Sequence, residues 1–282
     1  MTTHWEQGWL SFQQGSRTVV LHGEGAQYCT HALVEVQLIQ DSPTTLPSVL
    51  LEVQRLLDQF SSVFSTPTGL PPRRQCDHHI PLIPGARPVS IRHYKVDPNM
   101  KSELERQVQE LLDQGVIVHS QSAFSSPVIL VKKLEPAADE GALPTPTAWR
   151  LVVAYRHLNA LTVKSKYPLP VIDELLDELS GARWVSKLDL KAGYHQIRLA
   201  PGEEHKTAFQ THNGHFEFKV MAFGLTGAPA TFQQAMNASL ASVLRKFALM
   251  FFDDILIYSA TYDEHIQHLA TVLGILQKDS WQ

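Results

Sequence analysis

The chain has 282 residues, of which 44% are hydrophobic and 18% are charged, and its formal net charge at pH 7 is -4. This length and composition support one large domain or two small ones with a substantial core. The acidic balance argues against a free-standing nucleic-acid binder, which usually carries a basic excess, but it leaves room for a basic cleft.

Cysteine usage and apolar patterning predict a soluble protein of a reducing compartment. Cys29 and Cys76 lie far apart and form no spacing motif, so no disulfide framework is expected. The N-terminus lacks a basic-then-apolar signal pattern, and no apolar run is long enough to span a bilayer. We therefore expect an intracellular, cytoplasmic protein without membrane partners.

The first third of the chain divides into two predicted segments. Residues 1–45 are poorly defined, although 17–22 and 32–39 have the composition of strands. The spacing of apolar residues predicts a helix over 49–64. Six prolines between residues 65 and 97 exclude a regular helix there, so residues 46–97 are expected to be a helix followed by an extended arm.

Two adjacent histidines in this arm, His78 and His79, invite a metal interpretation. Adjacent side chains on an extended chain point to opposite faces, so a single ion is not expected to bind both. We interpret them as ordinary histidines of an extended segment.

Helices and strands interleave in the predicted third segment, residues 98–282. Asp97 and Pro98 supply an N-cap and a first-turn proline for a helix that Gly115 should end. Further helices are predicted at 172–179, at 229–244, and at 261–276 after a capping-box pattern. Strands are predicted at 116–118, 127–131, 149–155, 184–190, 194–199, 207–209, 216–220 and on both sides of residues 253–254. Because this order lacks a regular parallel crossover rhythm, we expect an α+β fold with helices covering a mostly antiparallel sheet.

The most informative stretch is 248–259, where Asp253 and Asp254 stand between two short, β-rich apolar runs. A hairpin with the acidic pair at its turn is the simplest geometry, and aspartate tolerates tight turns. However, adjacent like charges repel, and apolar walls raise the cost of ionising both, which a divalent cation would relieve. Taken alone, the stretch leaves a plain turn and a metal site equally open.

A third carboxylate, Asp189, ends an apolar run and precedes a Lys-Ala-Gly turn. If its strand neighbours the hairpin, the three carboxylates can hold two Mg²⁺ ions through hard oxygen ligands. Two ions roughly 3.5–4 Å apart can activate a hydroxyl and stabilise a leaving pyrophosphate. A two-metal nuclease is a competing hypothesis, but it needs further acids or a histidine near the triad that no motif here supplies specifically.

Seven sequence blocks carry a resemblance to a known family and occur in that family's order. They are Leu70-Pro-Pro-Arg73, Pro84-Gly-Ala-Arg-Pro-Val89, Ser126-Pro-Val-Ile-Leu-Val-Lys-Lys133, Tyr155-Arg-His-Leu-Asn159, Lys187-Leu-Asp-Leu-Lys-Ala-Gly-Tyr-His-Gln-Ile-Arg198, Phe223-Gly-Leu-Thr-Gly-Ala-Pro-Ala-Thr-Phe232 and Phe251-Phe-Asp-Asp-Ile-Leu-Ile-Tyr-Ser259. From about Leu70 to Asp279 the chain resembles the reverse transcriptase of gypsy-class long-terminal-repeat retrotransposons, those of plants especially. The last three blocks together are highly specific, whereas the acidic pair alone would be weak.

The resemblance implies a right-hand polymerase with fingers and palm, which joins a dNTP to a primer 3′-hydroxyl. Asp189 and Asp253 match palm aspartates that bind both metals, Asp254 supports them, and the Leu190 carbonyl touches the nucleotide metal. The implied cofactor is a pair of Mg²⁺ ions, for which Mn²⁺ can substitute. The implied partners are dNTPs, an RNA or DNA template with its primer, and other segments of a retroelement polyprotein associated with virus-like particles.

The resemblance also implies residues beside the sugar of the nucleotide. Tyr194, five residues after Asp189, matches an aromatic gate that would clash with a ribose 2′-OH and so select dNTPs. Without the motif, a core tyrosine would be the preferred interpretation. Phe223 and Gly224 match the start of the loop beside the sugar and the template base.

Further matches lie in the fingers. Arg150 matches an arginine that grips the triphosphate, a role that suits the planar guanidinium fork. Lys133 matches a neighbouring fingers lysine, although a Lys-Lys pair usually marks only a solvated strand end. Arg156 and Asn159 are expected to support the fingers or to touch the template.

The segment His212-Asn-Gly-His215 has a spacing that suits a metal, but Asn-Gly marks a hairpin turn. The family has a similar hairpin, so the structural interpretation is preferred.

Several features depart from the family pattern and leave a second function open. Ala154, Ala222 and Ala123 stand where relatives usually have Asp, Pro and Pro. Residues 134–148 are acidic where a short basic tip is usual, which should weaken triphosphate binding. The chain also ends before the family's primer grip, thumb and RNase H, so we expect a domain truncated after the palm hairpin, without a thumb, and residues 1–45 as the remnant after a lost protease. The alternative is a non-catalytic degenerate or domesticated remnant that acts at most as a nucleic-acid or protein binding module.

Overall fold

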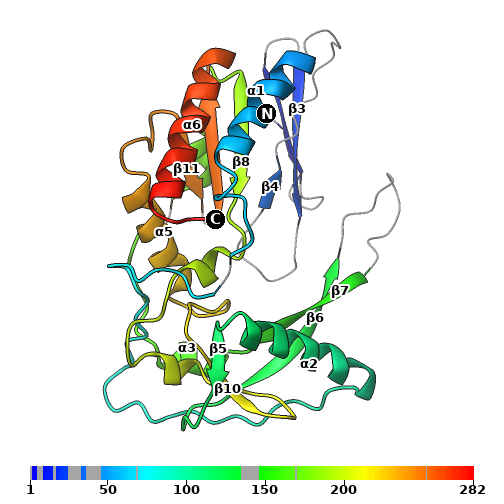
Figure 1. Cartoon of the computed structure of the whole chain (residues 1–282), viewed down its shortest axis with the longest axis vertical. Coiled ribbons are helices and arrows are strands. Elements are labelled where there is room, and N and C mark those ends of the chain that lie inside the picture. The colour runs from blue at the N-terminus through cyan, green and yellow to red at the C-terminus, as the bar shows by residue number, and fades with distance from the viewer. Residues whose placement is uncertain are drawn as a thin grey trace. The chain divides into compact units, whose positions relative to one another are not determined.

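The computed structural model describes residues 2–4, 9–14, 17–24, 33–35, 46–67, 69–134, 146–168, 170–251 and 253–282 (Figure 1). The predictions for most of the 134–148 insertion and for parts of the first 45 residues lie outside these ranges. The chain divides into two compact units, Met1–Leu51 and Glu52–Gln282. Helix α1 (Leu46–Gln59) crosses the boundary between them.

The first unit is a four-stranded antiparallel sheet in the order β1-β2-β3-β4. The predicted strand at 17–22 corresponds to β3 (Arg17–Glu24), and the one at 32–39 includes β4 (Leu33–Glu35), with its remaining residues outside the described ranges. Strands β1 (Thr2–His4) and β2 (Trp9–Gln14) were not predicted.

The second unit contains two sheets rather than the single one expected. A five-stranded sheet has the order β5-β10-β9-β6-β7, with bounds Ile117–His119, His215–Phe218, Phe209–Gln210, Ser126–Leu134 and Pro146–Val153. Its strands pair antiparallel except for β6 and β9. A three-stranded antiparallel sheet has the order β11-β12-β8, with bounds Ala248–Phe251, Asp254–Ser259 and Trp184–Asp189. The α+β class is thereby confirmed, and most strand pairs are antiparallel.

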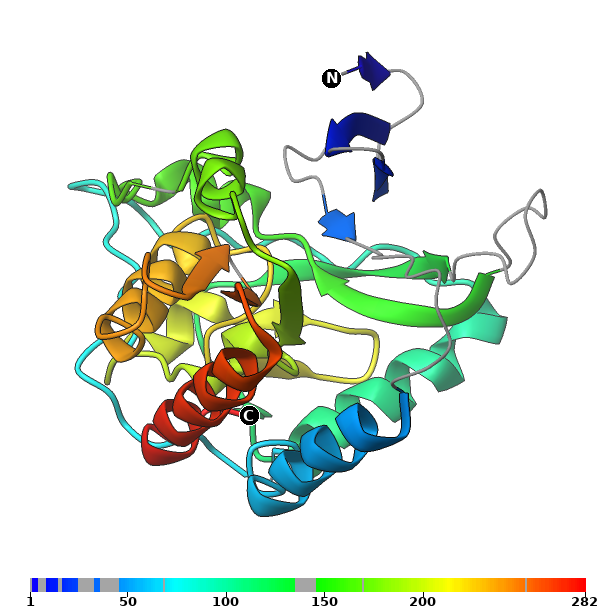
Figure 2. The ribbon, with the colours of Figure 1, turned by 90° about the horizontal axis from the view of Figure 1, so that it is seen from above.

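The described residues of the second unit form five further α-helices, namely α2 (Pro98–Asp113), α3 (Arg156–Leu161), α4 (Ile172–Glu178), α5 (Ala228–Ser239) and α6 (Tyr262–Lys278). Helix α6 contacts β12 and β8, whereas α5 contacts β11 (Figures 1 and 2). The predicted caps are confirmed: the Asp97 carboxylate accepts from Asn99 N, and Thr261 and Glu264 form a capping box.

One predicted strand is wrong, and the strand predicted at 207–209 is confirmed only at its end, where β9 begins at Phe209. Residues 193–196 and 204–207 form short 3₁₀ helices, and the strand predicted at 194–199 is limited to two isolated bridges, from Arg198 to Val220 and from Leu199 to His78. The cause is a tight turn, because Ala192 has a φ of 50° and reverses the chain directly before Tyr194. Helix α3 was not predicted because it spans only six residues, too few to show helical periodicity.

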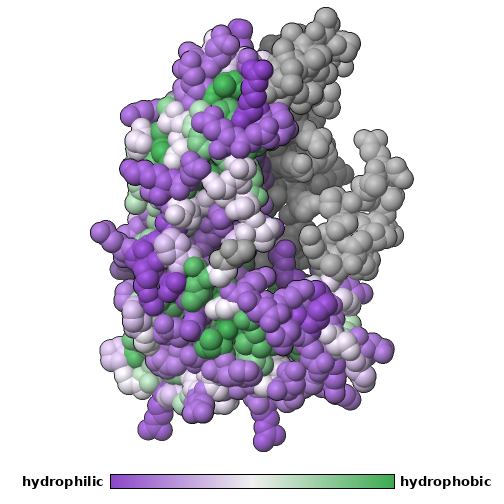
Figure 3. Space-filling model, in the orientation of Figure 1, coloured by the Kyte–Doolittle hydropathy of each residue, from purple (hydrophilic) through white to green (hydrophobic). Residues whose placement is uncertain are grey.

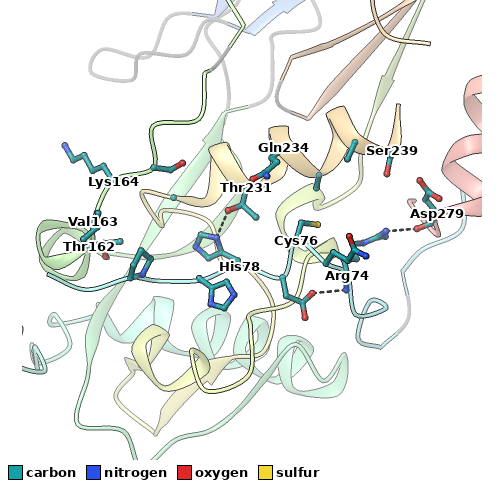
Figure 4. A pocket seen from close by; sticks show the side chains of 18 of the residues that line it. Arg74, Cys76, His78, Thr162, Val163, Lys164, Thr231, Gln234, Ser239 and Asp279 are labelled. Atoms are coloured by element: carbon teal, nitrogen blue, oxygen red, sulfur yellow. Dashed lines mark hydrogen bonds between the residues drawn. The ribbon is translucent and has the colours of Figure 1, made fainter. Parts of the chain in front are cut away.

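Residues 65–97 run as an extended arm across other parts of the second unit. Isolated bridges join His78 to Leu199 and Leu82 to Thr162, and the side chain of Ile80 is buried. His78 is 3% exposed and its Nδ1 lies 2.8 Å from Thr231 Oγ1, whereas His79 is exposed (Figure 4). The two histidines therefore point to different environments, and a cavity of about 930 Å³ lies between the arm and α5.

The face of the molecule shown in Figure 3 is mainly hydrophilic and carries only small hydrophobic patches. Among the described helices, none combines the length and the apolar character that crossing a membrane requires.

We predict that the buried ring of His78 makes the fold sensitive to acid. Burial lowers the pKa of His78 from 6.5 to about 4, with His79 adding to this effect and Glu203 opposing it. The unfolded chain binds the proton more readily, so stability falls as the pH drops from about 6.5 to 4, by up to about 3 kcal/mol. Urea unfolding of wild type and His78→Gln across this range should show a flatter pH dependence in the variant. His79→Gln, at the exposed neighbour, should keep the wild-type slope, and an unchanged slope in His78→Gln would contradict the assignment.

Candidate active site

The end of the three-stranded sheet brings the predicted carboxylates together. In the hairpin, Phe251 pairs with Asp254, so Asp253 lies in the turn and Asp254 is the first residue of β12. Strand β8 pairs antiparallel with β12, and its last residue, Asp189, lies directly opposite Asp254. The sequence could not establish this adjacency, and the strand register supplies it.

Burial and neighbouring charges raise the pKa values of two of the three carboxylates. Burial raises the pKa of Asp253 to about 6, and the charges of Asp189 and Asp254 add to this. Burial and Asp254 also raise the pKa of Asp189, against a lowering effect of Lys187. Lys187 Nζ lies 3.2 Å from Asp254 Oδ2, so one positive charge partly offsets three negative ones.

Asp253 carries a buried oxygen without a hydrogen-bond partner. Its Oδ1 atom is inaccessible to solvent and unpaired, an arrangement that normally costs free energy. The close approach of Gly193 allows this placement, because a Cβ atom there would lie 3.1 Å from Asp253 Oδ1 and 3.0 Å from Phe232 Cζ. The turn at Gly193 follows Ala192, whose left-handed backbone is unusual for alanine.

The carboxylate oxygens of Asp189, Asp253 and Asp254 are chemically suitable ligands for a divalent cation. Carboxylate oxygens are hard ligands, and the orphaned oxygen and the pKa values raised by burial and by neighbouring carboxylates mark carboxyl groups whose ionisation a cation would favour. As they are placed, however, the side chains do not converge: within the described ranges, no group of three or more His, Cys, Asp or Glu side chains is positioned to hold a metal ion. The ion pair with Lys187 engages one Asp254 oxygen.

Aromatic rings line one side of this cluster. The ring of Tyr194 lies 4.8 Å from that of Phe223 and 5.5 Å from that of Phe232. Burial raises the pKa of Tyr194, and Asp253 contributes to the shift. Tyr194 therefore packs as a core tyrosine would and also lies beside the acidic cluster. Phe223 is 45% exposed, so its ring is available to a ligand.

The neighbouring backbone is held by two predicted site residues. Leu190 N donates to the Asp253 carbonyl at 3.2 Å, which ties the end of β8 to the hairpin turn. Asn159 Nδ2 donates to the Gly224 carbonyl at 2.7 Å, and its Oδ1 accepts from Thr226 N at 3.0 Å. Asn159 thus supports the loop that begins at Phe223.

Two of the predicted fingers residues, Lys133 and Arg150, belong to the other sheet, whereas Arg156 lies on α3. Arg150 lies on β7 opposite Val131 and is exposed, and Arg156 is exposed at the start of α3. The backbone of Lys133 pairs within β6, while its side chain lies outside the described part of the structure. The structure therefore groups the aspartates with Tyr194 and Phe223, and it places the basic residues on separate elements.

The histidine pair of the Asn-Gly hairpin has two different partners. His212 Nε2 lies 2.8 Å from Glu105 Oε1, and His215 Nε2 lies 3.0 Å from the Phe124 carbonyl. This agrees with the structural interpretation of the segment.

Sequence reasoning assigned no role to Lys187, Gly193, Ala192 or Phe232. Lys187 could have been found, because alternation along a strand places it on the same face as Asp189. Gly193 stood in a recognised turn, but its contact with Asp253 depends on the fold. The left-handed backbone of Ala192 has no sequence signal.

Comparison with known proteins identifies the class. The profile of the reverse transcriptase (RNA-dependent DNA polymerase) family matches residues 132–281, more than half of the chain. The chain belongs to this family, whose reaction is RNA-directed DNA polymerisation and which generally uses divalent metal ions.

The relatives narrow the assignment. The chain is 40% identical over 185 residues to the retrovirus-related Pol polyprotein from transposon 297 of Drosophila melanogaster, covering 66% of this chain and 17% of that protein. It is 37% identical over 187 residues to the transposon Tf2-3 polyprotein of Schizosaccharomyces pombe, covering 66% and 13%. The chain thus corresponds to the reverse transcriptase domain of gypsy-class retrotransposon polyproteins and spans less than a fifth of these relatives.

Solved structures support the fold. The protease-reverse transcriptase of Prototype Foamy Virus, as the selenomethionine-labelled CSH mutant, matches 84% of this chain and 30% of its own with a TM-score of 0.70 and 21% identity. A foamy viral protease-reverse transcriptase in complex with RNA/DNA hybrid matches 96% of this chain and 38% of its own with a TM-score of 0.69 and 18% identity.

We predict that Asp253→Asn stabilises the metal-free protein at neutral pH. The carboxyl has a folded pKa of about 6, above its ordinary 3.8, so ionisation destabilises the fold as the pH rises from about 4 to 6. The neutral amide removes this repulsion, and the gain should be of order 1 kcal/mol after screening by solvent. Thermal melts in EDTA at pH 7.5 measure it. Asp254→Asn is the matched control, because it removes a carboxylate paired with Lys187 and should not stabilise; equal destabilisation by both variants would contradict the prediction.

Proposed function

We propose that this chain provides the nucleotidyl-transfer site of a retrotransposon reverse transcriptase, with Asp189, Asp253 and Asp254 as its metal-binding carboxylates. The observation that carries the proposal is the register of β8 and β12, which sets Asp189 opposite Asp254, beside the orphaned Asp253 oxygen. In this proposal the five-stranded sheet with α2 belongs to the fingers, and the three-stranded sheet with α5 and α6 to the palm. We also propose that this chain is most similar to the reverse transcriptases of plant retrotransposons, a proposal that the sequence blocks alone support.

The proposed reaction is attack of a primer 3′-hydroxyl on the α-phosphate of a dNTP, with pyrophosphate as the leaving group. When bound, two Mg²⁺ ions, or Mn²⁺ in their place, would neutralise the developing charge and ease deprotonation of the primer hydroxyl. Asp189 and Asp253 would hold both ions, and Asp254, released from Lys187, would complete the set. The Leu190 carbonyl, which already accepts from Gly193 N at 3.2 Å, retains a second lone pair for the same purpose.

The remaining residues would position the substrates. Tyr194 and Phe223 would support the deoxyribose, and Asn159 would hold the loop that carries Phe223 and Gly224. Arg150 and Lys133 would bind the triphosphate, and Arg156 would support the fingers. We propose a template with its primer as the nucleic-acid partner, since the foamy viral enzymes were solved with RNA/DNA hybrid and with double-stranded DNA.

A non-catalytic remnant is the second candidate. The remnant hypothesis is favoured by Ala154 and Ala222, which depart from the residues usual in the family. In the structure Ala222 is almost fully buried, and the backbone N–H of Ala154 donates to the Pro127 carbonyl at 2.9 Å. This candidate predicts no Mg²⁺-dependent binding of dNTPs, which titration calorimetry can measure.

Primer extension tests the proposal directly. We expect incorporation of dTTP on poly(rA)/oligo(dT) with Mg²⁺ or Mn²⁺, and loss of incorporation to background in Asp253→Asn because a metal ligand is removed. Asp263→Asn, in the first turn of α6, provides a carboxylate control and should retain activity. A folded wild-type protein that extends no primer and binds no dNTP would overturn the proposal in favour of the remnant.

The sugar gate is tested by substrate choice. Tyr194→Val should relax the preference for dTTP over UTP by about 10–200-fold, because the substitution removes the ring that would clash with the 2′-OH. The ratio of kcat/KM values for the two nucleotides measures it. An unchanged ratio with reduced stability would assign Tyr194 to the core alone.

A further inference from the structure

Strand β7 ends the five-stranded sheet, yet its free edge is occupied by a side chain of α2. Gln107 Nε2 donates to the Trp149 carbonyl at 2.8 Å, and Gln107 Oε1 accepts from Leu151 N at 2.8 Å. A carbonyl and an N–H two residues apart are the groups that a neighbouring strand would pair with. The amide of Gln107 therefore takes the place of a peptide group at this edge.

The orientation of the Gln107 amide is fixed from the helix side. Its Nε2 also donates to Glu103 Oε1 at 2.6 Å, and Arg106 donates to both Glu103 oxygens at 2.6 and 2.8 Å. The hydrogen bonds from Arg106 and Gln107 lower the pKa of Glu103 to about 2. Both amide hydrogens and the amide oxygen are thus engaged, and a flipped amide would set oxygen against a carboxylate.

The two bonded peptide groups flank Arg150. Backbone groups of alternate residues in a strand point to the same side, so those of Arg150 face β6, where Val131 is its partner in register. The backbone around Arg150 is therefore held from both sides, by β6 on one and by Gln107 on the other. Its own side chain is exposed.

We propose that Gln107, oriented by Glu103, is a positioning residue that sets the direction of Arg150 toward the triphosphate of the incoming nucleotide. The inference rests on the proposed function, which gives Arg150 its role. Gln107 touches no substrate itself and acts through the backbone on either side of Arg150. The simpler reading, in which the amide only protects a sheet edge, predicts a loss of stability without an effect specific to the nucleotide.

A double-mutant cycle distinguishes a positioning role of Gln107 from simple protection of the sheet edge. In primer extension by the full chain, Gln107→Leu should raise the KM for dTTP by about ten- to a hundredfold, because a displaced binding group costs orientation. The kcat should stay within about twofold. Combined with Arg150→Ala, the leucine should raise the KM no further, since its effect passes through Arg150. Gln109→Leu is the matched control: the same substitution on the same helix, at an exposed side chain that bonds Asp113 within α2.

Amide hydrogen exchange tests the contact between Gln107 and β7 without an activity measurement. Gln107→Leu should speed exchange at Leu151 N–H, and Gln109→Leu should leave it unchanged. If Gln107→Leu does not fold, Gln107→Asn keeps the amide but is one methylene too short to reach both peptide groups, and the same effects are expected.

The possible results distinguish a failure of the inference about Gln107 from a failure of the proposed role of Arg150. Fully additive effects of the Gln107 and Arg150 variants, or an unchanged KM in Gln107→Leu while Arg150→Ala raises it, would overturn the inference alone. An unchanged KM in Arg150→Ala would overturn the role of Arg150 in the proposed function and the inference with it.

Discussion

The structure of the candidate site depends on like charges held together at the end of one small sheet. Asp189 and Asp254 face each other across β8 and β12, and Asp253 lies in the adjoining turn. Burial, and then repulsion by Asp189 and Asp254, raise the pKa of Asp253, and one of its oxygens has no hydrogen-bond partner. A fold selected for stability alone would not keep this arrangement, because replacing one acid by a neutral residue would relieve it.

What holds the acids in place is the apolar packing behind them. The side chains of Ile255 and Ile257 on β12 are completely buried, as are Met236 on α5 and Val272 on α6. Burial of this kind favours the pairing of β12 with β8 by an amount that one unfavourable charge cannot reverse. The close contact at Gly193 adds a steric condition, since any side chain there would press on Asp253 and Phe232. The position of the site therefore depends on the buried apolar layer and on the close contact at Gly193.

Periodicity and capping residues predicted most of the second unit, because those signals are local. The helix beginning at Pro98, the hairpin around Asp253 and the helix after Thr261 all follow from residues within one or two turns. Tyr194 shows where local signals fail. Its neighbours alternate like a strand, but the left-handed backbone of Ala192 turns the segment into a 3₁₀ helix and carries the ring to Phe223 and Phe232. The pairing of Asp189 with Asp254 likewise depends on a strand register between residues 65 positions apart. No local sequence signal predicts this register, and only the family resemblance pointed to it.

The two sheets of the second unit fix their candidate site residues in different ways. Asp189 belongs to a short sheet whose other strands form a tight hairpin, and its position follows from pairing with β12 and from the hydrogen bond of the next residue, Leu190, to the Asp253 carbonyl. Arg150 stands on a long ribbon at the outer edge of a larger sheet, where pairing on one side leaves the strand free to twist. A second support is needed for a side chain there to keep a fixed direction. Helix α2 supplies it through Gln107, and it does so with hydrogen bonds to the backbone, which hold the strand without covering the exposed face that Arg150 presents.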